Sequence, residues 1–413
     1  MISLAVLEDI IEDQLARFHA KEIGIPREID FQKYIKTKQI TAIAGIRRGG
    51  KSTLLLQFSK KYWSFYYINF DDERLIDFTV KDFDNLMIAF QKKYEAKAIF
   101  LDEIQNIDKW ERFARRLYEE GYKIFLTGSN AKLLSSELAT HLTGRYFKIE
   151  LYPFSFREFL TAKSVDYQKK GSQTRAAVLR EFDEYAAGGG FPEFVAYNDP
   201  EFVQRIYEDV LYRDLLTRFG IRDVKAFKHL AKFLFSNISK EISYNGLKNT
   251  LGFKSVMSVK NYIEYMEQSY LVFELYKYDF SLKKQLVSGR KIYAIDNGMR
   301  NTIAYFTSQD EGRLLENLVF LELKRRGREI YYFKNKRECD FIVREKSAVT
   351  EAIQVTAHFN IDNREREVNG LLEAMDAFAL KKGLILTQDA EDLLKIDSKS
   401  IIVKPIYKWL LEK

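Results

Sequence analysis

The segment GIRRGGKST, residues 45–53, constrains this chain more than any other. It satisfies the pattern G-x-x-x-x-G-K-[ST], follows an apolar run and opens a helical pattern. Glycines let backbone N–H groups wrap around phosphates, and a helix start adds the positive end of its dipole. We therefore expect Lys51 on the β- and γ-phosphates and Ser52 on Mg²⁺. The residues predicted to bind the nucleotide are Gly45, Gly49, Gly50, Lys51, Ser52 and Thr53.

Five short apolar runs, rich in β-branched and aromatic residues, alternate with helical patterns in the first part of the chain. They are residues 39–45, 64–70, 97–103, 122–128 and 146–151. Buried strands that alternate with helices predict a parallel sheet with helices on both faces. The fold expected for residues 1–152 is therefore an α/β phosphate-binding domain, with residues 1–38 as an N-terminal helical segment.

The third apolar run ends in an acidic pair, Asp102 and Glu103. At the carboxyl end of a strand beside a phosphate loop, Asp102 can hold Mg²⁺ through water, and Glu103 can polarise the attacking water. The alternative is a pair of carboxylates that merely ends a strand. Beside the phosphate loop the first interpretation is favoured, so we expect ATP and Mg²⁺ as cofactors and Glu103 as a catalytic residue.

Together these motifs resemble those of the AAA+ ATPases. The resemblance implies a polar sensor residue in LTGSN, where Asn130 matches best and Thr127 or Ser129 are alternatives. It also implies an arginine finger just before the fifth strand, which Arg145 matches. Such an arginine neutralises charge on the γ-phosphate, usually that of a neighbouring subunit, so Arg145 implies a homo-oligomer. A surface arginine at a strand start is the alternative.

The resemblance extends over the whole chain. Residues 153–218 have helical patterns interrupted by GGGFP, and residues 219–304 have three helical patterns followed by a strand pair, the order of a winged helix. With YPFSFREFL and GGGFP, the chain resembles bacterial and archaeal ATPases of one kind. In them an AAA+ sheet and a helical lid, here 153–218, precede a winged helix, here 219–304. A restriction-endonuclease-like domain of unknown function follows, here 305–413.

A winged helix can read DNA with its third helix and contact phosphates with its wing. The positions expected to do so are Ser255, Ser258, Lys260 and Asn261 on the helix and Lys283, Lys284, Arg290 and Lys291 at the wing. Against this, Glu264 and Glu267 on the same helix would repel phosphate. Docking on a protein is therefore the alternative role of this domain.

The C-terminal segment resembles nucleases of the PD-(D/E)XK type, which need a helix acid, a strand Asp and a Glu-x-Lys pair to hold Mg²⁺ and orient water. Carried onto this chain, the acid is Glu316 and the Asp is Asp340, but the pair falls on Gln354 and Thr356. Gln354 can still offer a carbonyl to a metal, whereas Thr356 cannot replace a cation. We expect a degenerate site that serves as a scaffold or holds DNA.

The sequence thus predicts an ATP-hydrolysing AAA+ switch or motor that acts on DNA or a DNA-associated partner through its C-terminal half. The alternatives are an ATP-regulated, metal-dependent nuclease and a protein-interaction switch without nucleic acid. A net charge of +7 agrees weakly with DNA. The single cysteine, Cys339, and four histidines argue against a structural zinc site, and no run of 18 apolar residues exists. We expect a cytoplasmic protein without a membrane partner.

Overall fold

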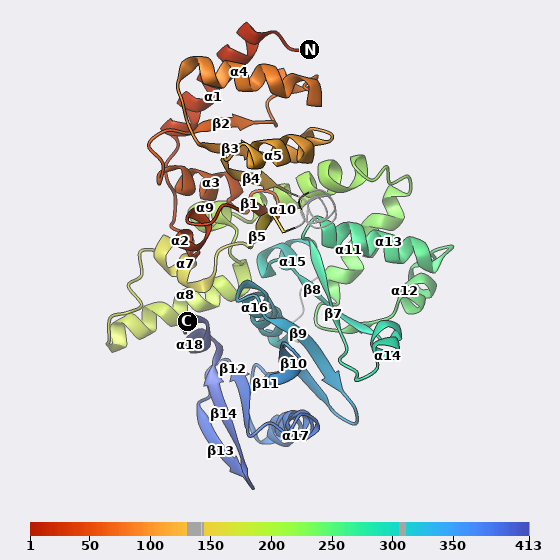
Figure 1. Cartoon of the computed structure of the whole chain (residues 1–413). Helices are drawn as coiled ribbons and strands as arrows, with labels where there is room; N and C mark the ends of the chain where they lie inside the picture. Colours follow the sequence, from red (N-terminus) through yellow and green to blue (C-terminus); the bar gives the residue numbers. More distant parts are fainter. Residues whose placement is uncertain (130–141, 143, 305–310, 413) are drawn as a thin grey trace. The chain divides into compact units, whose positions relative to one another are not determined.

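The computed structural model describes residues 1–129, 142, 144–304 and 311–412, and Figure 1 labels their helices and strands. The chain divides into two compact units. The N-terminal unit comprises Met1–Tyr152 with Gln268–Tyr270, and the C-terminal unit comprises Pro153–Glu267 with Leu271–Lys413. The first unit holds the predicted phosphate loop, and the second holds nearly everything that follows the fifth predicted strand.

A five-stranded parallel sheet forms the centre of the N-terminal unit. Its strands are β1 (Ile40–Gly45), β2 (Tyr66–Asn69), β3 (Ala98–Asp102), β4 (Lys123–Gly128) and β5 (Tyr146–Leu151), in the order β2-β3-β4-β1-β5. They coincide with the five predicted runs to within two residues at each end. The α/β fold class with a parallel sheet is confirmed, and its geometry brings the carboxyl ends of all five strands to one edge.

Helices cover both faces of this sheet. They are α1 (Leu4–Ala20), α2 (Phe31–Ile35), α3 (Lys51–Ser59), α4 (Phe83–Lys93) and α5 (Trp110–Glu119), with 3₁₀ turns at Glu73–Leu75, Val80–Asp82 and Ile104–Asn106. Successive residues of a strand point to opposite faces. Tyr66 stacks on Phe90 of α4 at 4.7 Å between ring centroids, and Tyr67 stacks on Phe18 of α1 at 3.9 Å. The two tyrosines thus anchor one helix on each face.

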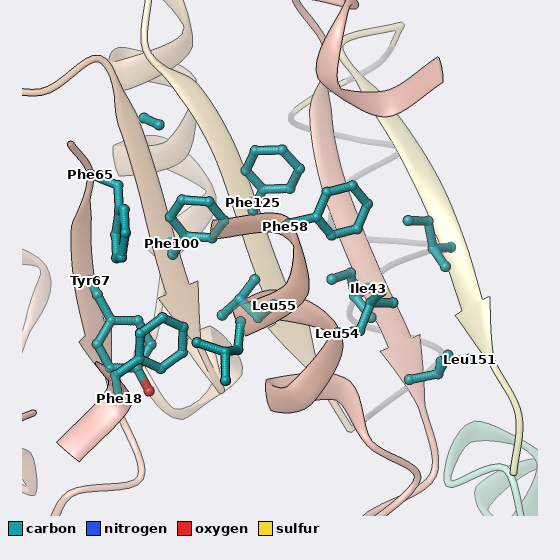
Figure 2. Packing of buried hydrophobic residues seen from close by; sticks show 13 residues of the cluster. Phe18, Ile43, Leu54, Leu55, Phe58, Phe65, Tyr67, Phe100, Phe125 and Leu151 are labelled. Carbon is teal, nitrogen blue, oxygen red and sulfur yellow. The ribbon is translucent and has the colours of Figure 1, made fainter. Parts of the chain in front are cut away.

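The face that carries α1 and α3 holds an aromatic core, which Figure 2 shows from close by. Phe58 of α3 lies against Phe125 of β4, and Phe125 stacks in parallel on Phe100 of β3, both at 4.8 Å between centroids. Burying a phenylalanine side chain contributes about 1.5–3 kcal/mol. This packing fixes α3, which begins at Lys51, against β4 and β3, and β3 ends in the acidic pair.

The C-terminal unit begins with helices only. They are α7 (Phe156–Ala162), α8 (Ser172–Gly188), α9 (Pro192–Tyr197), α10 (Pro200–Asp209) and a π-helix at Val210–Thr217. Between α8 and α9, Gly189 has a φ of +78°, and a Cβ there would lie 2.0 Å from Oδ1 of Asp296. Asp296 also accepts the backbone N–H of Gly190 at 2.7 Å. The GGGFP turn therefore needs glycine at position 189, because the buried Asp296 carboxylate packs against it.

Three helices and a small antiparallel sheet come next. The elements are α11 (Val224–Ser236), β6 (Glu241–Ile242), α12 (Tyr244–Leu251), α13 (Val256–Gln268), β7 (Val272–Tyr276), α14 (Leu282–Val287) and β8 (Arg290–Ala294). The strand order is β6-β8-β7. The expected order of three helices and then a strand pair is present. The short helix α14 between the two strands was not expected.

The rest of the C-terminal unit is built on a six-stranded mixed sheet of order β13-β14-β12-β11-β10-β9. Its elements are α15 (Asn297–Ile303), α16 (Glu311–Arg325), β9 (Glu329–Lys334), β10 (Glu338–Glu345), β11 (Ala348–Val355), α17 (Ile361–Ala377), β12 (Lys382–Thr387), β13 (Asp392–Ile396), β14 (Lys399–Pro405) and α18 (Ile406–Leu411). Leu371 and Met375 of α17 are buried in the core of this sheet. Of the helices described, none has the length and apolar character that crossing a membrane requires.

Candidate functional site

The predicted phosphate loop lies between the end of β1 at Gly45 and the start of α3 at Lys51. A Cβ on Gly45 would lie 2.2 Å from the carbonyl oxygen of Leu151, so only glycine fits beside β5. Gly50 has a φ of +97°, which a side chain would strain. The N–H of Gly49 donates to the carbonyl of Ile46 at 3.1 Å. The loop is therefore a tight turn whose helix begins at the predicted lysine, with Ser52 and Thr53 in its first turn.

Lys51 faces the acidic pair at the end of β3. Its Nζ donates to the carbonyl of Ile46 at 3.2 Å and lies 3.7 Å from Oε1 of Glu103. Burial favours the neutral form of Glu103, but the charge of Lys51 and a hydrogen bond from Gln105 outweigh it and lower the pKa of this carboxyl. Glu103 is thus held as the carboxylate, the form that can polarise or deprotonate water.

Asp102 is fully buried beneath the loop. Its Oδ1 accepts the hydroxyl of Thr127 at 2.5 Å, its Oδ2 accepts the hydroxyl of Tyr67 at 3.3 Å, and the Ser52 side chain also hydrogen-bonds to it. Burial and the charge of Glu103 raise the pKa of Asp102, while the hydrogen bonds from Thr127 and Ser52 act in the opposite direction. The loop serine and the strand aspartate are therefore in direct contact.

The contact between Ser52 and Asp102 fits a magnesium ion bound together with a nucleotide. Both side chains offer hard oxygen atoms, and Mg²⁺ in such sites takes one or two carboxylates plus substrate phosphates. Within the described part of the chain, no group of three or more His, Cys, Asp or Glu residues is arranged to hold a metal ion by itself. Ser52 and Asp102 would hold Mg²⁺ with the phosphates, and the ion would neutralise charge on them.

The sensor residue favoured by the sequence, Asn130, lies outside the described residues. The two alternatives are described, and both touch the acidic pair. Thr127 accepts the backbone N–H of Glu103 at 2.9 Å in addition to its bond to Asp102, and Ser129 donates to Oε2 of Glu103 at 3.4 Å. The end of β4 therefore orients both carboxylates of β3.

Arg145 lies directly before β5, as the sequence predicts. Its carbonyl accepts the N–H of Ile40, the first residue of β1. The phosphate loop leaves the other end of β1 at Gly45, five residues further on and roughly 17 Å away at about 3.3 Å per residue. Arg145 is thus placed away from the phosphate loop of its own chain.

The C-terminal unit brings three of the four nuclease-like residues together. Oδ2 of Asp340 accepts the N–H of Val355 at 3.0 Å, and the Asp340 N–H donates to Oε1 of Gln354 at 3.3 Å. Gln354 in turn donates to Glu367 at 2.7 Å, and Glu316 lies on α16 beside this pair. All four predicted residues line one pocket of about 770 Å³.

The fourth residue, Thr356, takes no part in this cluster. Its hydroxyl donates to the carbonyl of His358 at 2.8 Å and accepts from Asn363 at 3.1 Å. It therefore ties down the loop before α17, and it supplies no positive charge to the carboxylates.

A lysine from a distant strand supplies the carboxylates with the positive charge that Thr356 lacks. Nζ of Lys291, on β8, lies 2.9 Å from Oε1 of Glu316 and 3.0 Å from Oδ1 of Asp340. It also lies 2.8 Å from Oε1 of Glu338. Burial and the charge of Asp340 raise the pKa of Glu316 to about 7, against the effect of Lys291. Tyr293, two residues along β8, donates to the same Oε1 of Glu316 at 2.6 Å.

Two relatives are similar to this chain over nearly its whole length. An uncharacterized protein of Methanocaldococcus jannaschii, MJ1544, is 37% identical over 434 residues, which cover 100% of this chain and 96% of that protein. The chain belongs to the family of that protein. An uncharacterized protein of Haemophilus influenzae is 32% identical over 409 residues, which cover 94% of this chain and 99% of the relative. Residues 37–160 match the model of an AAA domain, and residues 179–310 match a domain of unknown function.

Solved structures resemble this family member only distantly. One is of the Aeropyrum pernix ORC1 protein in complex with DNA, with a TM-score of 0.30 and 11% identity, covering 72% of this chain and 91% of that chain. Another is of AMPPCP-bound DnaA from Aquifex aeolicus, with a TM-score of 0.27 and 15% identity, covering 61% and 91%.

Sequence reasoning missed residues that support the AAA domain from outside its motifs. The guanidinium of Arg27 donates to the carbonyl of Gly49 at 3.0 Å and to that of Tyr152 at 2.6 Å, and it is buried. Gln105 contacts Glu103 directly. Gln105 lies two residues after the acidic pair, so its contact with Glu103 could have been predicted from the sequence. Arg27 gave none, because its partners lie far along the chain.

The structure corrects the expected basic surface of the wing in this family member. Lys291 was expected to contact phosphate, but its side chain is buried in the carboxylate cluster. Arg290 is partly buried, and its Nε lies 3.3 Å from Glu274. As successive residues of β8 they point to opposite faces of its sheet, and each meets a carboxylate on its own face. Lys283 and Lys284, on α14, are exposed as expected.

Proposed function

We propose that this chain is an ATP-hydrolysing AAA+ switch whose C-terminal half engages DNA or a DNA-associated partner. One observation carries the ATPase part: Lys51 and Glu103 face each other across the phosphate loop of an AAA domain, 3.7 Å apart. A cation for the phosphates and an ionised carboxylate for the water are thus adjacent. Both groups serve hydrolysis of the phosphoanhydride bond between the β- and γ-phosphates of ATP.

In this site Lys51 binds the β- and γ-phosphates and replaces its contact to the Ile46 carbonyl with them. Asp102 and Ser52 would hold Mg²⁺, which would neutralise charge on the phosphates, and Glu103 polarises the attacking water or accepts its proton. Thr127 and Ser129 keep the two carboxylates oriented. Asn130 remains the predicted sensor of the γ-phosphate.

Arg145 is proposed as the arginine finger of a neighbouring subunit. Its backbone lies at the opposite end of β1 from the phosphate loop of its own chain. An arginine placed there can complete a nucleotide site only in another copy, so this role requires a homo-oligomer.

For the C-terminal half we propose a helical lid at residues 153–218, a winged helix at 219–304 and a degenerate nuclease-like domain at 305–413. The order α11, β6, α12, α13, β7, β8 with a three-stranded antiparallel sheet supports the winged helix. Exposed Lys260 on α13 and exposed Lys283 and Lys284 at the wing support contact with phosphates.

A second candidate role for the wing is docking on a protein. The wing also exposes four apolar side chains, which would gain nothing from a phosphate backbone. They are Phe280, Leu282, Leu286 and Val287. A partner that covers this apolar tip would make the chain a nucleotide-controlled protein-interaction switch.

An ATPase assay with site variants tests the main proposal. Lys51→Ala should lose both binding and hydrolysis of ATP, and Glu103→Gln should keep binding while its turnover falls roughly 100-fold or more. Lys60→Ala, at the exposed far end of α3, is the matched control and should behave as wild type. Wild-type turnover in Lys51→Ala would contradict the assignment.

Binding of duplex DNA across a salt series separates the two partners. If the wing contacts phosphates, the affinity falls steeply with salt, and the double variant Lys283→Glu, Lys284→Glu lowers it further. The pair Lys381→Glu, Lys382→Glu changes two exposed lysines elsewhere and serves as the charge-matched control. If neither double variant changes DNA binding, or if no DNA binding is detected, the favoured partner of the wing is a protein.

A further inference from the structure

The carboxylate cluster of the C-terminal unit already contains a cation. Lys291 reaches it from β8, Glu316 from α16, and Glu338 and Asp340 from β10. The three carboxylates surround the ammonium nitrogen at 2.8 to 3.0 Å, and the lysine side chain is 2% exposed. This lysine is therefore held by the fold at the centre of the acidic group.

The ammonium group of Lys291 has no capacity left for a reaction. It has three N–H donors, and the three carboxylates take one each. All three contacts lie within hydrogen-bond distance, and the side chain is buried. An ammonium group whose donors are all taken can neither act as a base nor orient water.

We propose that Lys291 is an internal substitute for a divalent cation, and that its removal uncovers a Mg²⁺ or Mn²⁺ site formed by Glu316, Glu338 and Asp340. A compact charge surrounded by hard carboxylate oxygens is the environment that these ions take. The same three residues line the open pocket of about 770 Å³, whereas Lys291 does not. A hydrated ion can therefore reach their oxygen atoms from the pocket.

The native charges leave little room for a metal ion as well. Nζ of Lys334 lies 3.3 Å from Oε2 of Glu338 and so neutralises part of the same cluster. With two ammonium groups against three carboxylates, a divalent ion gains little attraction and must be dehydrated to enter. The two lysines therefore offset the carboxylates, and we expect the native pocket to bind no metal ion.

Titration of Mn²⁺ into the nucleotide-free full-length chain tests the proposal. Wild type should show no Mn²⁺ site that depends on Asp340. Lys291→Met should gain one site that binds at least ~10-fold more tightly than anything in wild type. Adding Asp340→Asn to Lys291→Met should remove the gained site, and the absence of nucleotide keeps the ATP site out of the signal.

Two further variants make the result specific. Lys291→Arg retains the charge and should gain no site. Lys334→Met removes a lysine that touches only Glu338 among the three carboxylates, so it should also gain none. Lys291→Gln is the milder replacement if Lys291→Met is poorly folded.

Two outcomes would overturn the proposal. The first is Mn²⁺ binding in wild type that Asp340→Asn abolishes, because the lysine would then share the cluster with a metal. The second is failure of both Lys291→Met and Lys291→Gln to gain a site. The wild-type comparison with Asp340→Asn requires no change at Lys291 and stands independently of how those variants fold.

Discussion

The hydroxyl of Thr127 donates a hydrogen bond of 2.5 Å to Oδ1 of Asp102, joining the ends of β4 and β3 at the nucleotide site. The hydroxyl oxygen of Thr127 in turn accepts the backbone N–H of Glu103 at 2.9 Å. One side chain thus fixes the direction of the carboxylate assigned to Mg²⁺ and the backbone of the carboxylate assigned to water. The acidic pair is positioned by a neighbouring strand as well as by its own.

Thr127→Val keeps the shape of this side chain and removes its hydroxyl. A hydrogen bond to a charged group contributes about 1.5–3 kcal/mol, so we expect turnover of ATP to fall roughly 10- to 100-fold while ATP binding changes little. Thr41→Val removes another buried hydroxyl of the same sheet and is the control. Steady-state ATPase rates compare the two, and equal rates in both variants would contradict the positioning role.

Arg27 connects the N-terminal segment to the phosphate loop and to the end of β5. Arg27→Met leaves the buried carbonyls of Gly49 and Tyr152 without their donors, which costs about 1–3 kcal/mol per unsatisfied group. We expect weaker binding of a fluorescent ATP analogue and a lower unfolding midpoint of the N-terminal unit. Arg112→Met, an exposed change on α5, should affect neither quantity. Unaltered ATP affinity in Arg27→Met would rule out support of the loop.

The nucleotide site could be predicted from the sequence because its parts are local patterns on parallel strands. The loop follows β1, the acidic pair ends β3, and Thr127 ends β4. A parallel sheet brings all three ends to one edge. Recognising buried strands was therefore enough to place Lys51 beside Glu103.

The contacts of Arg27 and Lys291 could not be predicted in the same way. Arg27 and Tyr152 are 125 residues apart, and Lys291 and Asp340 are 49 apart. No periodicity spans such distances. A weak signal did exist in KIYAIDN, because strand alternation places Lys291 and Tyr293 on one face, and both reach Glu316. The prediction that this hairpin forms a solvent-exposed wing placed Lys291 at the surface instead.

Glu267 on α13 should make the C-terminal unit less stable as the pH rises. Burial and the charge of Glu274 raise its pKa from 4.5 to about 8. The folded state therefore binds the proton more tightly than the unfolded chain, so stability is present at low pH and is lost between about pH 4.5 and 8. A rise in the pKa from 4.5 to about 8 corresponds to a loss of at most ~5 kcal/mol in the free energy of unfolding across this pH range.

Glu267→Gln removes this titration and retains an acceptor for the N–H of Glu274, which Glu267 accepts at 2.8 Å. Its unfolding midpoint should match wild type near about pH 4.5 and exceed it near about pH 8. Scanning calorimetry of the C-terminal transition measures both. Glu365→Gln, at an exposed position of α17, should follow wild type throughout. A variant whose pH profile is parallel to that of wild type would refute the assignment.

Purified wild-type protein should not nick supercoiled plasmid in Mg²⁺ or Mn²⁺. Lys291 neutralises Asp340 and has no donor left for water, and Thr356 supplies no charge, so neither a metal ion nor a base is available for cleavage. Asp340→Ala is the matched control, because it separates activity of this cluster from a contaminating nuclease. Residual nicking that persists in Asp340→Ala is contamination. Nicking that Asp340→Ala abolishes would show that the cluster cleaves DNA in spite of Lys291.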